Sequence, residues 1–166
     1  MSVGAWWSAV ALMAGLAVAS GAERAEAEDT TTGATAAAAS SATIHQEIDL
    51  AASPDRIYDA LLSAKQFGAL TGLPTEIAAE VGGAFSCFGG HIVGRTVELV
   101  PNRRIVQAWR VATWPEGVYS IARFELRLQH AGTRVIFDHT GFPPELRDHL
   151  AAGWEDHYWK ALRTLK

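Results

Sequence analysis

The chain ends with the segment PELRDHLAAGWEDHYWKALRTL, residues 144–165, and this segment constrains everything before it. Its apolar side chains recur at three- and four-residue spacing: Leu146, Leu150, Trp154, Tyr158, Ala161 and Leu165. This spacing predicts one long helix with a single apolar stripe. Such a stripe has to be covered, so we expect the preceding part of the chain to supply a large apolar surface for it.

The residues before this helix are expected to form a β-sheet, which would supply that apolar surface. Turn signals divide them into short alternating runs, which predict strands over 76–81, 84–88, 91–100, 103–112, 118–130 and 133–140. In 118–130, apolar residues such as Phe124 alternate with charged residues such as Arg123. In 133–140, Val135, Phe137 and His139 share one face. The alternation predicts an antiparallel sheet with one face toward water and one toward the core.

One more strand and two short helices precede this run. TIHQEIDL, residues 43–50, alternates as a half-buried strand does. Ser53 and Pro54 follow as the N-cap and first residue of a helix, and a second helix is expected over 65–70. We therefore predict an α+β fold. A curved antiparallel sheet of six to seven strands wraps around the long C-terminal helix, and two short helices follow the first strand.

The N-terminal residues differ from the domain in composition. Residues 1–22 carry no charge, and the mainly apolar run Trp6–Ala19 has the length of a signal-peptide core, so we predict a signal peptide over 1–22. Residues 23–42 contain no large apolar side chain and predict a flexible linker to a domain over 43–166. We expect export to the periplasm or the exterior. Because no basic residue precedes the apolar run, the alternatives are an uncleaved anchor or a start codon placed upstream of a cytoplasmic protein.

Composition and motifs exclude several classes of function. The net charge of −4 is unlike the basic surface that binds nucleic acid. The single cysteine, Cys87, allows no intrachain disulfide and is interpreted as a core residue. The chain has no HExxH, CxxC or Gly-x-Ser-x-Gly pattern, so no metal, no cofactor and no activated serine is indicated. After cleavage of the signal we expect no membrane span.

A concentration of aromatic residues marks the candidate site. RIVQAWRVATWPEGVYS, residues 104–120, places Trp109, Trp114 and Tyr119 around a Pro-Glu-Gly turn. These rings either pack the open end of the sheet or line a pocket for an apolar molecule. The predicted ligand-binding set is Phe67, Leu70, Phe85, Phe88, Trp109, Trp114, Tyr119, Phe124, Phe137, His139, Trp154 and Tyr158.

His139 is the polar candidate within this set, because its side chain has the inward parity of Phe137. It would orient a ligand by a hydrogen bond or act as an acid or base. The alternative is that a neighbouring side chain simply satisfies its hydrogen bonds. Glu98 and Asp138 are the nearest carboxylates in sequence, but Asp138 has the opposite parity. No catalytic residue beyond this candidate is assigned, and the sequence favours a binding role over an enzymatic one.

Several runs resemble a known family: ELVPNRRIVQAWRVATWPEG (98–117), HTGFP (139–143) and AAGWEDHYWKAL (151–162). They are similar to the C-terminal domain of the activator of heat-shock protein 90 ATPase, in the START-like helix-grip superfamily (SRPBCC). The resemblance implies a sheet gripping a long helix, often with an apolar cavity between them. The function expected is binding of a small apolar or amphipathic ligand. The alternatives are a protein-interaction module regulating a chaperone or ATPase, and a cyclase- or lyase-like enzyme using His139.

Overall fold

The structure is a computed structural model and describes residues 42–166. The predicted signal peptide over 1–22 and the predicted linker over 23–42, apart from Ala42, lie outside the described residues. Within residues 42–166, no helix combines the length and the apolar character needed to cross a bilayer.

The elements follow one another in the order expected for the predicted fold. The first strand is followed by two helices, then by strands, then by a C-terminal helical segment. In chain order they are β1 (Thr43–Leu50), α1 (Pro54–Leu62), α2 (Ala64–Thr71), β2 (Glu76–Ile77), β3 (Ala84–Cys87), β4 (Ile92–Val100), β5 (Arg104–Val111), β6 (Ser120–Gln129), β7 (Gly132–Thr140), η1 (Pro144–Leu146), α3 (Arg147–Gly153), η2 (Trp154–Trp159) and α4 (Lys160–Leu162).

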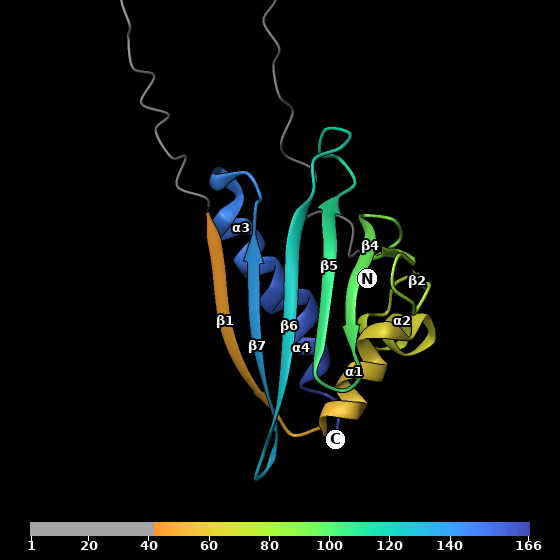
Figure 1. Ribbon diagram of the computed structural model, residues 1–166, viewed down its shortest axis with the longest axis vertical. Helices are drawn as coiled ribbons and strands as arrows, with labels where there is room; N and C mark the ends of the chain where they lie inside the picture. The colour runs from red at the N-terminus through yellow and green to blue at the C-terminus, as the bar shows by residue number, and fades with distance from the viewer. Residues whose placement is uncertain (1–41) are drawn as a thin grey trace, which may run out of the picture. The chain divides into compact units, whose positions relative to one another are not determined.

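The strands form one antiparallel sheet in the order β1-β7-β6-β5-β4-β3-β2. The first strand therefore lies beside the last one, and the intervening strands form a meander. Figure 1 shows the C-terminal helical segment running behind the strands, while α1 and α2 lie near β4 and β2. The predicted fold class is confirmed: a curved sheet grips the C-terminal helix, and two short helices follow the first strand.

Alternation along the strands places the core as expected. Ile105, Gln107 and Trp109 of β5 are buried on the inner face, and so are Phe124 of β6 and Phe137 of β7. Buried apolar area of this size is the main stabilising contribution to a domain. The outer face of the sheet carries the charged residues that the alternation predicts.

The predicted strand over 76–81 is wrong in length, because β2 contains only Glu76 and Ile77. The chain leaves the sheet at Ala78 in a tight turn, in which the Glu80 N–H donates to the Ala78 carbonyl at 2.9 Å. A Cβ at Gly83 would lie 2.2 Å from the Ala78 carbonyl oxygen, so the turn requires glycine there. This close backbone approach ends the strand and leaves β2 as a short edge.

The C-terminal helix also departs from the regular helix that the spacing predicts. Its middle, η2, is a π-helical segment, in which each turn contains more residues than an α-helical turn. The inward stripe therefore continues through Trp159 and Leu162, which are fully buried, whereas the predicted Ala161 is only partly buried. Trp154 and Trp159, five residues apart, stack with ring centroids 5.9 Å apart.

Candidate functional site

One end of the grip is organised around His139, which β7 places on the inner face with no exposed surface. The indole N–H of Trp154 donates to His139 Nδ1 at 3.0 Å. His139 Nε2 lies 2.7 Å from Ser120 Oγ, and the Ser120 hydroxyl donates to the Trp109 carbonyl oxygen at 2.9 Å. A continuous chain of hydrogen bonds thus joins the C-terminal helix to β7, β6 and β5.

This chain determines which ring nitrogen of His139 carries the proton. An indole N–H is only a donor, so Nδ1 must be the acceptor. The Ser120 hydroxyl gives its single proton to the Trp109 carbonyl and accepts from His139, so Nε2 must be protonated. The imidazole is therefore neutral. Burial lowers the pKa of His139 to about 3, since the charged form would have to give up its hydration.

His139 consequently has no free nitrogen for a ligand or a proton transfer. Of the two interpretations of His139, the geometry matches the simpler one: neighbouring side chains satisfy its hydrogen bonds. Neither of the two carboxylates considered lies near it: Asp138 is bonded to His45 at 2.7 Å on the outer face, and Glu98 is paired with Arg104. Within residues 42–166, no group of His, Cys, Asp and Glu side chains could hold a metal ion.

Aromatic rings fill the space around His139. The ring centroid of Trp154 lies 4.3 Å from that of Phe137 and 5.5 Å from that of Trp109, which in turn meets the edge of Trp114 at 5.7 Å. Trp159 closes the inner side and donates its indole N–H to the Gln46 side-chain oxygen at 2.7 Å. We call this set the aromatic end of the grip.

The long β5–β6 connection is explained by the contacts of Arg110. Its guanidinium donates to the backbone carbonyls of Ala112 and Trp114 and lies over the ring of Tyr119, 5.6 Å from the centroid. Tyr119 is 46% exposed and is not among the residues that line the cavity described below. Its ring packs against Arg110 on the surface, and its place at the border of a ligand pocket stays a prediction.

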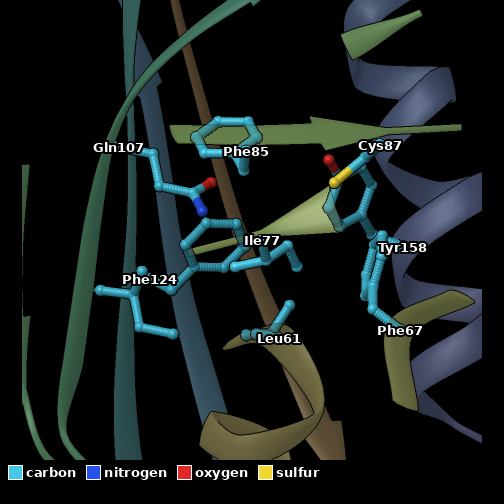
Figure 2. A pocket seen from close by; sticks show the side chains of 9 residues that line it. Leu61, Phe67, Ile77, Phe85, Cys87, Gln107, Phe124 and Tyr158 are labelled. Atoms are coloured by element: carbon cyan, nitrogen blue, oxygen red, sulfur yellow. The ribbon is translucent and has the colours of Figure 1, made fainter. Parts of the chain in front are cut away.

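A small cavity, shown in Figure 2, lies beside the aromatic end, toward β2 and β3 of the sheet. The two regions are in contact, since the ring centroids of Trp154 and Tyr158 are 4.2 Å apart. Its volume is about 10 Å³, which is room for about one water-sized molecule. It is lined by Leu61, Phe67, Ile77, Phe85, Cys87, Ile105, Gln107, Phe124 and Tyr158. No side chain in this lining is charged. We call this region the Gln107 cavity.

Gln107 is the most polar group of this cavity. Its side chain is only 8% exposed, and Figure 2 shows the amide pointing into the cavity between Phe85 and Phe124. Within the described part of the chain, the amide makes no hydrogen bond to another residue. Its partner across the strands is Thr96, whose buried hydroxyl also has no hydrogen-bond partner in residues 42–166. A β-bulge at Val97 follows Thr96 directly.

Two weak acids complete the lining. Burial raises the pKa of the Cys87 thiol to about 12 and the pKa of the Tyr158 hydroxyl well above its usual value. The Trp109 indole near the Tyr158 hydroxyl acts in the opposite direction to burial and lowers the pKa of Tyr158. Both groups therefore stay protonated at neutral pH, and Cys87 is not a reactive thiolate.

The predicted ligand-binding residues divide between the two regions. Phe67, Phe85, Phe124 and Tyr158 line the Gln107 cavity, and Phe88 packs against two of them, with ring centroids 5.6 Å from Phe67 and 5.3 Å from Tyr158. Leu70 packs against the core. The remaining inward residues of the set belong to the aromatic end: Trp109, Trp114, Phe137, His139 and Trp154.

Five lining residues were absent from the predicted set: Leu61, Ile77, Cys87, Ile105 and Gln107. A signal for the last was present, because Gln107 shares the inward face of its strand with Ile105 and Trp109. A polar residue between two apolar ones on a core-facing strand deserves the same weight as a histidine in that place.

Comparison with known proteins identifies relatives of this domain. The family model described as "Activator of Hsp90 ATPase homolog 1-like protein" matches residues 51–165. The human activator of 90 kDa heat shock protein ATPase homolog 1 is 26% identical over 111 residues, covering 67% of this chain and 33% of that protein. The Dictyostelium discoideum homolog is 32% identical over 104 residues, covering 62% of this chain and 27% of that protein. The chain thus spans about a third of the length of these curated relatives.

Solved structures resemble the whole described domain. A Plasmodium falciparum protein titled an HSP90 activator has a TM-score of 0.67 at 24% identity, covering 75% of this chain and 94% of that one. A Chromobacterium violaceum protein has a TM-score of 0.60 at 25% identity, covering 74% of this chain and 96% of that one. The fold is common to all three, and the family model matches most of this sequence. The chain belongs to the family of Activator of Hsp90 ATPase homolog 1-like proteins.

Proposed function

We propose that this domain acts by binding a protein partner and regulating it, the partner being an ATPase of the chaperone type. The observation that carries the proposal is the filled interior: aromatic rings occupy the grip around His139, and only about 10 Å³ remains beside Gln107. Little room is left to enclose a guest, so the surface is the better candidate for function. Family membership supports the same conclusion, since the curated relatives are named as activators of an ATPase.

The outer face of β4–β6 is the surface that suits a partner. Val97 of β4 and Ile121 of β6 are exposed there, and just before β6 the exposed Tyr119 packs under Arg110 of β5. Exposed apolar side chains bordered by arginine and tyrosine are typical of protein interfaces. Ion pairs lie on both parts of this face, for example Arg134 with Asp49 at 2.8 Å on the β1–β7 side and Arg123 with Glu125 on β6. The exposed apolar side chains Val97 and Ile121 distinguish the β4–β6 side, so we place the contact there.

The test measures ATP turnover by the heat-shock protein 90 of the same organism with increasing amounts of the full chain. We expect turnover to rise, and we expect Ile121→Asp to weaken the apparent affinity about tenfold or more, because a charge would be buried in the contact. Leu128→Asp is the matched control, since Leu128 is 75% exposed at the far end of β6. Turnover that the chain leaves unchanged, in this ATPase and in any other chaperone ATPase of its compartment, would remove the proposal.

The compartment determines which ATPase the chain meets. Residues 1–22 are predicted to direct export, and an exported chain would act on a partner outside the cytoplasm. Fusion of residues 1–42 to a reporter that is active only after export tests this. An active reporter places the partner search in the periplasm or the exterior. An inactive one supports the cytoplasmic alternative and a cytoplasmic ATPase.

A second candidate function is binding of a small, mainly apolar molecule between sheet and helix. The observation that favours it is the Gln107 amide, which is buried and aimed into a cavity without a protein partner. Buried polar groups are satisfied in nearly all proteins, so a polar group left open inside a cavity is typical of a site completed by a bound molecule. Native mass spectrometry of gently purified full chain tests it, because a retained guest adds a defined mass.

A further inference from the structure

We propose that the Gln107 cavity selects a neutral, mainly apolar molecule carrying one group that both donates and accepts hydrogen bonds, such as an aromatic alcohol. The inference rests on the second candidate function, since it names the chemical class that this cavity would hold.

The hydrogen-bonding requirement comes from Gln107, whose amide offers an N–H donor and a carbonyl acceptor to the cavity. Thr96, opposite it in the β4–β5 register, has a buried hydroxyl without a partner in the described residues, but it does not line the cavity. A guest with only an acceptor would leave the Gln107 carbonyl unbonded, and a hydrocarbon would leave both the carbonyl and the N–H of the amide unbonded. A hydroxyl supplies a donor and an acceptor in one small group.

The neutrality requirement comes from the rest of the lining. None of the lining side chains is charged, and the Cys87 thiol and Tyr158 hydroxyl stay protonated at neutral pH. A carboxylate or an ammonium would lose its hydration without gaining a counter-charge, which is a large cost. The aromatic walls, Phe67, Phe85, Phe124 and Tyr158, suit a ring in offset or edge contact.

The room for such a guest has to come from the movable side of the cavity. Ile77 lines it from β2, a strand of two residues at the edge of the sheet that pairs only with β3. Two further backbone bonds flank this pairing, one from the Ala78 N–H to the Ala84 carbonyl and one from the Gly89 N–H to the Pro74 carbonyl. Short edge segments with few hydrogen bonds open most readily. The β2 segment is therefore the part that a guest larger than water would displace.

The experiment compares three probes of similar size, phenol, toluene and benzoate, binding to the full chain. Dissociation constants come from two-dimensional NMR titrations, in which shift changes at Ile77 and Tyr158 identify the site. We expect phenol to bind, toluene to bind at least about tenfold more weakly, and benzoate not to bind. Gln107→Leu should reverse the order of phenol and toluene, because it replaces the amide by an apolar group of similar size. Gln129→Leu, at the end of β6, is the matched control and should leave the order unchanged.

The outcomes separate the two levels of the proposal. If none of the three probes binds, the second candidate function fails and the ligand class falls with it. If phenol and toluene bind equally well and Gln107→Leu leaves both unchanged, the cavity binds molecules but does not select the proposed class. Binding of benzoate would likewise contradict the neutrality requirement while leaving ligand binding in place.

Discussion

Two neighbouring parts of the grip differ in how their buried polar groups are bonded. At the aromatic end, His139, Ser120 and the Trp154 indole form a chain in which each of their donors has an acceptor, although the Trp109 indole N–H beside them has no hydrogen-bond partner in residues 42–166. At the Gln107 cavity, the amide and the Thr96 hydroxyl face each other across two strands without protein partners in the described region. The first arrangement holds the sheet to the helix, whereas the second leaves hydrogen-bonding capacity for something else.

The difference depends on which side chain of the C-terminal helix packs against each region. To the aromatic end the helix brings Trp154, whose ring fills space and whose N–H completes the bonding of His139. Against the cavity it brings Tyr158, whose hydroxyl lies near Cys87 and Trp109. A buried polar group costs stability unless it is bonded, so the two regions should respond to substitution with opposite signs.

The largest effect is expected for Trp154→Ala. It removes a fully buried ring and leaves His139 Nδ1 without its donor, so we expect the free energy of unfolding to fall by about 3–5 kcal/mol. Urea unfolding followed by circular dichroism measures it. Leu128→Ala, at a residue that is 75% exposed, should change the value by less than about 0.5 kcal/mol. A loss at Trp154 no larger than this control would show that the aromatic end does not hold the grip together.

The pH dependence of stability should report His139. Burial lowers its folded pKa to about 3, below the unfolded value, so between these pKa values the unfolded chain binds a proton that the folded chain does not. The contribution of neutral His139 to the free energy of unfolding is fully present above the unfolded pKa of about 6.5. As the pH drops from there toward 3, the free energy of unfolding falls by about 1.4 kcal/mol per pH unit.

The matched variant for this measurement is His139→Gln, which keeps one acceptor and one donor but does not titrate. Its unfolding free energy should depend less steeply on pH between 4 and 6.5 than that of the unaltered chain. Equal slopes would mean that the imidazole reaches water and that the aromatic end is not closed.

A smaller loss is expected for Ser120→Ala. It leaves the His139 Nε2–H without an acceptor in a buried site, so the free energy of unfolding should fall by about 1–3 kcal/mol. Thermal and urea unfolding both measure it. If the loss is close to zero, the chain of hydrogen bonds contributes specificity of packing and little stability.

The smallest effect, with the opposite sign, is expected for Gln107→Leu. It replaces an amide that no described residue bonds by an apolar side chain of similar volume, so the free energy of unfolding should stay the same or rise by about 1 kcal/mol. Thr96→Val, which removes the facing hydroxyl, should behave in the same way. A loss comparable with that of Ser120→Ala would show that the amide is already bonded in solution, and the contrast between the two regions would disappear.

Periodicity predicted most of the fold. Alternation in 118–130 and 133–140 identified the inward faces of β6 and β7, and the stripe through Leu150, Trp154 and Tyr158 identified the helix they grip. It failed at β2, where a backbone contact at Gly83 ends the strand, and at Trp159, where the π-helical segment shifts the stripe. Both failures depend on backbone geometry that single-residue patterns do not encode.

The site was predicted less completely, for a related reason. The alternation along β7 correctly placed His139 on the inner face. It could not show whether Trp154 or a ligand would hydrogen-bond the ring, because that depends on how the C-terminal helix is rotated toward the sheet. Gln107 has the same inward parity but was not part of the predicted set. Whether a polar residue is satisfied is a property of its neighbours in space, which for His139 lie 15 and 19 residues away in the chain.

The π-helical segment has a consequence for how this domain tolerates changes in length. The wide π-helical turn accommodates one residue more than α-helical pitch would, so loss of one residue between positions 155 and 157 would return the segment to α-helical pitch. The side chains now at Trp159, Leu162 and Leu165 would stay on the face that meets the strands, since the remaining buried positions then follow α-helical spacing. Deleting a residue from the α-helical turn before it, α3, has no such compensation and would rotate all that follows by about 100° around the axis. Deletion of the exposed Asp156 should therefore be tolerated better than deletion of the exposed Ala152 one turn earlier.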